Sequence, residues 1–117
     1  MAATSFTVSH GSIRIKVKLL PTVRDVHLDH QTKAKRNCNG GTVMGFFLPS
    51  QRSSRYVGTV VLPLDGKLRE LVPHEITHAV IHYFNGVLSH DDEACCTAIG
   101  RLCAIVFKRI EQLGGGV

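Results

Sequence analysis

The residues with the clearest potential for chemistry are two histidines and a glutamate in one short segment. His74, Glu75 and His78 form an H-E-x-x-H pattern. On a helix, residues four apart share one face about a turn apart, so both imidazoles can point at one ion. Glu75 then stands beside that ion, where its carboxylate can take a proton from a zinc-bound water. The spacing therefore predicts a zinc site with His74 and His78 as ligands and Glu75 as the catalytic base.

A catalytic zinc normally has three protein ligands, so the pattern requires a third. A following helix is predicted over residues 90–113, and Glu93 lies just inside its first turn. At helical spacing Glu93 shares a stripe with Thr97, Gly100, Ala104 and Phe107. If this stripe of mostly small residues faces the motif helix, Glu93 is buried at the level of the two histidines and needs a cation. We therefore predict Glu93 as the third ligand, with Cys96, His90 and Asp92 as alternatives.

His82 continues the face of the two motif histidines but is not predicted to be a ligand. A third turn of one straight helix cannot easily reach the same ion. We expect His82 to pack beneath the site or to bond a group that supports it. Tyr56 and His90 are the candidates for stabilising a developing oxyanion.

These residues also carry a family resemblance. The run from His74 to His82, followed by Asp92-Glu93-Ala94, resembles the ImmA/IrrE family of zincin-like proteins and short gluzincin-type domains of phage genomes. The resemblance implies that His74, His78 and Glu93 hold zinc and that Glu75 is the base. It covers residues 56–107 and departs from the family at Cys95-Cys96-Thr97, where a pattern rich in Ala and Phe is usual. The chain also has no room for the additional domains that members of that family often carry.

The elements that must position these residues follow from periodicity and turn signals. Alternating apolar and charged residues predict a strand over residues 12–20. Thr22 is a candidate cap for a short helix over residues 22–35. Two β-rich runs, residues 42–48 and 55–62, predict a hairpin with a longer connection.

The motif helix is predicted over residues 73–84, because Pro73 suits a first helical turn. The order of elements predicts an α+β domain, with a small, mostly antiparallel sheet of about three strands packed on the motif helix and the following helix. With the resemblance, this is a minimal zincin-like domain. Zincin-like enzymes align an extended peptide along a sheet edge beside the metal, and residues 55–62 are the candidate edge.

Length and composition favour one small domain over residues 1–117. A chain of this size buries about two thirds of its unfolded surface, which is enough for one core. No stretch approaches the roughly 20 apolar residues of a membrane span, and no run of signal-peptide length follows the first residue. We expect a cytoplasmic protein, in the host cytoplasm if it is phage-encoded. The cysteines include no C-x-x-C pair and are predicted to be reduced thiols.

The net charge of +5 gives only a weak argument for a nucleic-acid partner. Arg14, Lys16 and Lys18 alternate with apolar residues and are explained as the solvent face of a strand. No known nucleic-acid-binding motif surrounds Tyr56 or the few phenylalanines. A protein or peptide is therefore the expected partner, and nucleic acid is not.

The function predicted from the sequence is a zinc metallopeptidase of the H-E-x-x-H type. Glu75 would activate the zinc-bound water, which attacks a peptide carbonyl polarised by the metal. The alternative is a catalytically silent zincin-fold binding protein, a phage or bacterial factor that acts on a host protein without cutting it. The residues indicate neither the substrate nor the oligomeric state.

Overall fold

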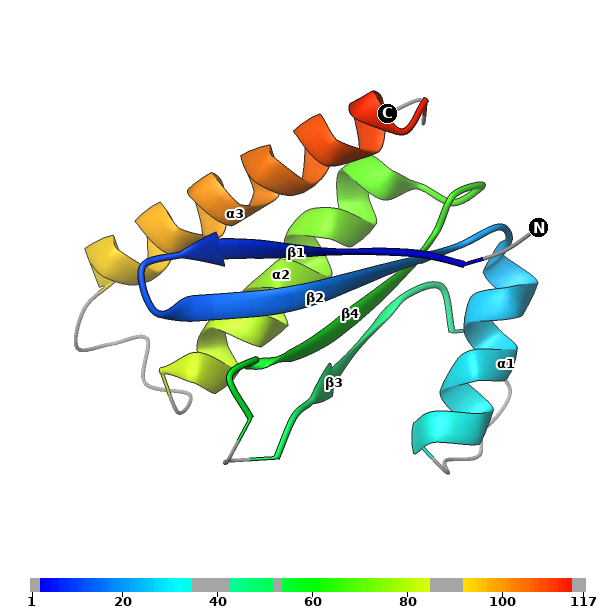
Figure 1. Cartoon of the computed structure of the whole chain (residues 1–117), viewed down its shortest axis with the longest axis horizontal. Helices are drawn as coiled ribbons and strands as arrows, with labels where there is room; N and C mark the ends of the chain where they lie inside the picture. Colours follow the sequence, from blue (N-terminus) through cyan, green and yellow to red (C-terminus); the bar gives the residue numbers. More distant parts are fainter. Residues whose placement is uncertain (1–2, 35–42, 52–53, 85–91, 115–117) are drawn as a thin grey trace.

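The chain folds into an α+β structure, and the computed structural model describes residues 3–34, 43–51, 54–84 and 92–114 of it. The elements in chain order are β1 (Thr4–His10), β2 (Ile13–Leu20), α1 (Val23–Ala34), β3 (Phe46–Pro49), β4 (Gly58–Pro63), α2 (Leu68–Tyr83) and α3 (Asp92–Gln112). The strands form one sheet in the order β1-β2-β4-β3 (Figure 1). Pairs β1/β2 and β3/β4 are antiparallel, whereas β2/β4 is parallel. The prediction of a mostly antiparallel α+β fold is confirmed.

The first strand was not predicted, so the sheet has four strands where about three were expected. In the β1/β2 register His10 lies opposite Ile13, which leaves Gly11 and Ser12 as a two-residue turn. Gly11 has φ of 58°, a conformation that glycine adopts without steric cost. A Gly-Ser pair between two alternating runs is a hairpin signal, and it was present in the sequence.

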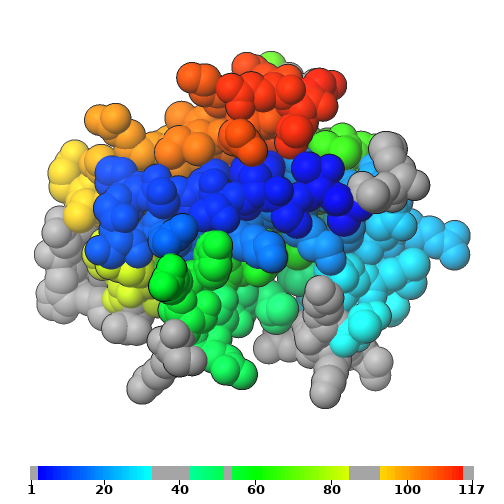
Figure 2. Space-filling model, in the orientation of Figure 1, coloured from blue at the N-terminus to red at the C-terminus, as the bar shows by residue number. Residues whose placement is uncertain are grey.

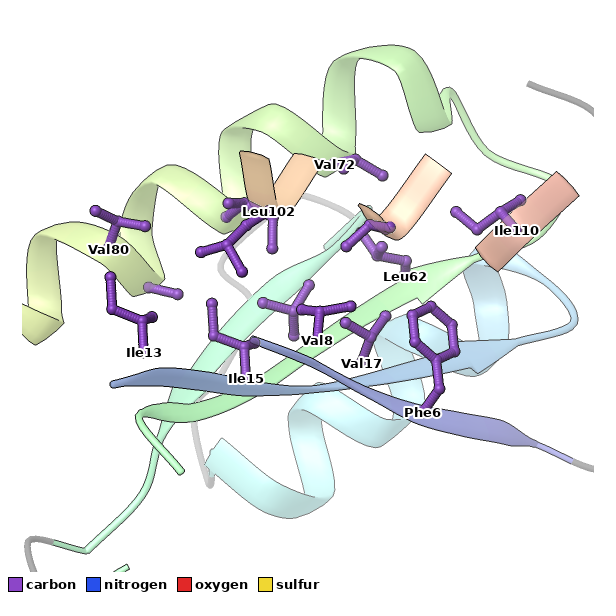
Figure 3. Close-up of a cluster of buried hydrophobic side chains, with 14 of the residues drawn as sticks. Phe6, Val8, Ile13, Ile15, Val17, Leu62, Val72, Val80, Leu102 and Ile110 are labelled. Atoms are coloured by element: carbon purple, nitrogen blue, oxygen red, sulfur yellow. The ribbon is translucent and has the colours of Figure 1, made fainter. Parts of the chain in front are cut away.

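The prediction for β2 is confirmed, because its residues alternate between a buried and a solvent-facing row. Its buried row packs against α2 and α3, which cover the same face of the sheet. Figure 3 shows side chains from β1, β2, β4 and both helices meeting in this layer. The side chains that Figure 3 labels there are Phe6, Val8, Ile13, Ile15, Val17, Leu62, Val72, Val80, Leu102 and Ile110.

Helix α1 packs on the opposite face of the sheet and stands apart from the α2 and α3 pair in Figure 1. Its start confirms the predicted cap: the Asp25 backbone N–H donates to Thr22 Oγ1 at 3.1 Å, and Asp25 Oδ2 accepts from the Thr22 backbone N–H at 3.2 Å. This reciprocal pair satisfies backbone donors that a helix start otherwise leaves free. Val26 then anchors α1 in a small core with Phe46 and Val61.

The expected sheet edge was wrong. Residues 55–62 were the candidate edge, but β4 lies inside the sheet between β2 and β3. Its successive residues Val60, Val61 and Leu62 are all buried, because α2 and α3 cover one face and α1 the other. A continuous apolar run is typical of a strand buried on both faces. The edge next to α2 is instead β3.

Helix α2 begins earlier than predicted, at Leu68, and so contains Pro73 in its second turn rather than at its start. Leu68 and Val72 are buried on the same face as Ile76. Packing of this stripe therefore extends the helix ahead of the proline, although proline cannot donate the usual backbone hydrogen bond.

Candidate metal centre

The two motif histidines lie side by side on the solvent-facing side of α2. Val72, Ile76 and Ala79 turn the opposite side of the helix into the core, which leaves His74 and His78 exposed. Their Nε2 atoms are 3.3 Å apart, within hydrogen-bond distance with either ring as the donor, and their ring centroids are 4.8 Å apart with the rings nearly perpendicular at 81°. The predicted meeting of the two imidazoles is present in the structure.

Glu75 lies between these histidines and the core. Its exposed fraction is only 5%, and its Oε2 is 3.9 Å from His74 Nε2. Burial raises the pKa of Glu75 above its ordinary value, while charge on His74 and His78 acts against this shift. The ligand atoms of the three residues lie within 4.8 Å of one another, so this cluster could hold a metal ion.

The cluster opens into a pocket of about 740 Å³. Glu75 and both histidines line one wall, and β3 forms another through Phe46 and Phe47. Phe46 belongs to the core under α1, whereas Phe47 packs toward α2. The pocket therefore runs along the outer edge of β3, between the two layers of helices.

Two further histidines line the same pocket. His82, from the next turn of α2, lies against the Phe47 ring with centroids 5.7 Å apart. His30, from α1, meets the Phe46 ring edge-on at 4.9 Å. Neither belongs to the cluster of ligand atoms in the described part of the chain. The sequence reasoning missed His30, because only the tertiary fold brings α1 to the pocket.

Glu93, the predicted third ligand, is not brought into this cluster. It is exposed near the start of α3 and lines a different hollow, of about 380 Å³, with His10 and Tyr83. The predicted contact stripe was wrong, because Thr97 and Gly100 are exposed. The buried stripe of α3 consists of Cys95, Ala98, Leu102, Val106 and Ile110. This stripe has the larger apolar side chains, so its burial fixes the rotation of the helix and leaves Glu93 outside.

The other candidates lie apart from the pocket or cannot be placed. Cys96 is exposed on α3 and does not line the pocket. His90 and the side chain of Asp92 lie outside the described residues. Tyr56 was a candidate oxyanion stabiliser, but its hydroxyl lies 3.4 Å from Thr7 Oγ1 of β1, and it does not line this pocket.

Comparisons of the chain with family models, with curated proteins and with solved structures find no match. Among the described residues, no helix combines the length and the apolar character that crossing a bilayer requires.

Proposed function

We propose that the protein is a zinc-dependent metallopeptidase whose metal is held by His74 and His78. The observation that carries this proposal is the distance of 3.3 Å between their Nε2 atoms. Two nitrogens that bind one tetrahedral zinc at about 2.0–2.1 Å must lie about 3.3–3.4 Å apart. The side chains therefore have the separation that a shared zinc ion needs, and imidazole nitrogen is a preferred zinc ligand.

Glu75 is proposed as the general base of hydrolysis. When bound, zinc would polarise a peptide carbonyl and make water a better nucleophile at neutral pH. Glu75 has its carboxylate within 4.8 Å of both histidine nitrogens, at the wall of the pocket. From this position it can accept a proton from water and pass it to the leaving amine.

Strand β3 is proposed to align the substrate. It is the last strand in the sheet order and lines the pocket beside Glu75. An extended peptide can add to such an edge through main-chain hydrogen bonds. Gly45 and Phe47, which line the pocket there, would then flank the bound chain. This proposal replaces the earlier candidate edge, which lies inside the sheet.

The family resemblance and the geometry of the pocket predict different residues as the third zinc ligand. The resemblance to ImmA/IrrE proteins implies Glu93, whereas the pocket itself offers His30 from a different helix. The described arrangement predicts that Glu93→Ala keeps its zinc and that loss of a ligating histidine lowers zinc content. Zinc content of the Glu93→Ala, His30→Ala and His82→Ala proteins decides between them. Loss of zinc from Glu93→Ala alone would show that Glu93 reaches the metal as the resemblance implies.

The proposed function is tested by metal content together with cleavage of a peptide library. We expect about one zinc per chain, and cleavage that Glu75→Gln abolishes while zinc stays bound. Glu70→Gln is the matched control, because Glu70 is exposed on the same helix and does not line the pocket. Unchanged cleavage by Glu75→Gln would refute the mechanism. Zinc without any cleavage, together with recovery of an intact stoichiometric partner, would support the binding-protein alternative.

A further inference from the structure

The outer face of β1 and β2 carries a row of hydroxyl groups beside a row of cations. Residues opposite one another on neighbouring strands project to the same face. Because the alternate residues of both strands are buried in the core, these pairs point away from it. The outward pairs are Ser5 with Lys18, Thr7 with Lys16, and Ser9 with Arg14. The two strands thus present cations and hydroxyls together, without a carboxylate among them.

Most of this face stays uncovered. Helix α1 reaches only one end of it, where Asp29 Oδ1 lies 3.4 Å from Lys18 Nζ. Arg14 and Lys16, farther along β2, are exposed, and neither forms an ion pair with a described carboxylate. Figure 2 shows β1 and β2 (blue) as a continuous surface across the middle of the molecule. A positively charged surface therefore remains accessible to solvent.

An aromatic ring stands at the uncovered end of this surface. The guanidinium of Arg14 lies over the Tyr56 ring, 5.5 Å from its centroid, and the Tyr56 hydroxyl lies 3.4 Å from Thr7 Oγ1. The hydrogen bond with Thr7 lowers the pKa of Tyr56, and the charges of Arg14, Lys16 and Arg55 lower it further. The cations therefore converge on the tyrosine. A hollow of about 290 Å³ opens beside this ring, bounded by Arg55 and by the last turn of α2.

We propose that this face binds single-stranded nucleic acid. Arginine, lysine, serine and threonine are the side chains that contact phosphate and sugar, and they alternate here over two strands. Tyr56 and the Arg14 guanidinium offer planes on which unpaired bases stack. This surface is named the hydroxyl–cation face, and it consists of the three outward pairs with Arg55 and Tyr56.

Single-stranded nucleic acid fits these observations better than the other polyanions. An acidic peptide would use the cations but would have no use for a stacking ring. Duplex DNA could contact the cations through its phosphates, but its bases are paired and stacked and leave no free base plane for the Tyr56 ring. The proposal departs from the expectation drawn from the sequence, in which Arg14, Lys16 and Lys18 were only a solvent face.

The test is binding of fluorescein-labelled 12-nucleotide dT and rU oligomers, followed by fluorescence anisotropy between 50 and 300 mM salt. Three available cations, Arg14, Lys16 and Arg55, predict a slope of log K against log salt of about −2, at about −0.7 per contact. Arg14→Gln/Lys16→Gln should make the salt dependence shallower, with a slope of about −0.7, and should weaken binding about 25-fold at 0.1 M salt. The matched control, Arg101→Gln/Lys108→Gln, removes the same two charges from exposed positions of α3 and should bind as the wild type does.

Tyr56→Leu separates nucleic acid from other polyanions. It should weaken oligonucleotide binding at least about 5-fold without changing the salt slope, because stacking is lost and no charge is removed. A labelled 12-residue polyglutamate peptide is the competing probe. Polyglutamate binding as tight as that of the oligomers, insensitive to Tyr56→Leu, would overturn the proposal in favour of an acidic protein partner. Absence of oligonucleotide binding by the wild type, or equal loss in the control, would also overturn it.

Discussion

Zinc should stabilise the wild-type protein against heat and leave a protein without the two motif histidines unchanged. A ligand that binds only the folded state adds about 2.7 kcal/mol when its free concentration is 100-fold above Kd. For 117 residues, the entropy of unfolding is about 0.25 kcal/mol/K, at about 2.1 cal/mol/K per residue. The midpoint of thermal unfolding should therefore rise by about 11 °C at that zinc concentration.

The assay is thermal unfolding of chelator-stripped protein, followed by circular dichroism during a titration with zinc chloride. His74→Ala/His78→Ala removes both nitrogens of the 3.3 Å pair and should abolish the shift. His10→Ala is the matched control, because His10 lines a different hollow and should leave the shift intact. An equal shift in the double variant would place the metal elsewhere. If zinc caused no shift in the wild-type protein, the proposed metal centre would be refuted, and with it the proposed peptidase activity.

Three other predictions follow from burial and packing. In the presence of a metal chelator, Glu75→Gln should raise the midpoint of thermal unfolding at pH 7. Burial raises the pKa of Glu75, so the charged carboxylate destabilises the folded state at that pH. This gain should vanish below about pH 4, where glutamate is neutral in both the folded and the unfolded protein. Burial raises the pKa of Cys103 to about 11 from 9.0. At pH 8 its thiolate fraction is therefore roughly 100-fold smaller than that of an unburied cysteine. Mass spectrometry should show iodoacetamide modifying it far more slowly than the exposed Cys96, and equal rates would contradict this. Gly58→Ala should cost about 1–3 kcal/mol in thermal melts, since its Cβ would meet the backbone carbonyl oxygen of Leu48 and the Phe47 ring in β3. In contrast, Gly100→Ala at an exposed position of α3 should be neutral or stabilising.

Features that depend on neighbours along the chain could be predicted from the sequence. The alternation of β2 and the Thr22 cap involve contacts within a few residues, and both are confirmed. The meeting of His74 and His78 is equally local, because one helical turn sets their separation. Strand β1 could also have been predicted, since the Gly-Ser turn that precedes β2 is a local signal in the sequence.

Features set by tertiary packing could not be predicted in the same way. Glu93 lies on a stripe of small residues, yet burial of the larger stripe that includes Leu102 and Ile110 decides how α3 is rotated. His30 reaches the pocket only because α1 packs against the core residue Phe46. The position of β4 inside the sheet likewise depends on pairing between segments that are distant in the sequence. Its unbroken apolar run was nevertheless a usable sign of a central strand.

The two proposed sites should be separable by mutation, because no side chain of the hydroxyl–cation face lines the pocket of the metal centre. Ile15 and Val17 point into the core under α2 and α3, so Arg14 and Lys16 must project from the opposite face. Arg14→Gln/Lys16→Gln should therefore keep the full zinc-dependent rise in unfolding midpoint while it loses oligonucleotide binding. His74→Ala/His78→Ala should show the reverse. If either variant abolished both activities without lowering the metal-free midpoint, the two surfaces would be coupled and the proposed independence of the two sites would be refuted.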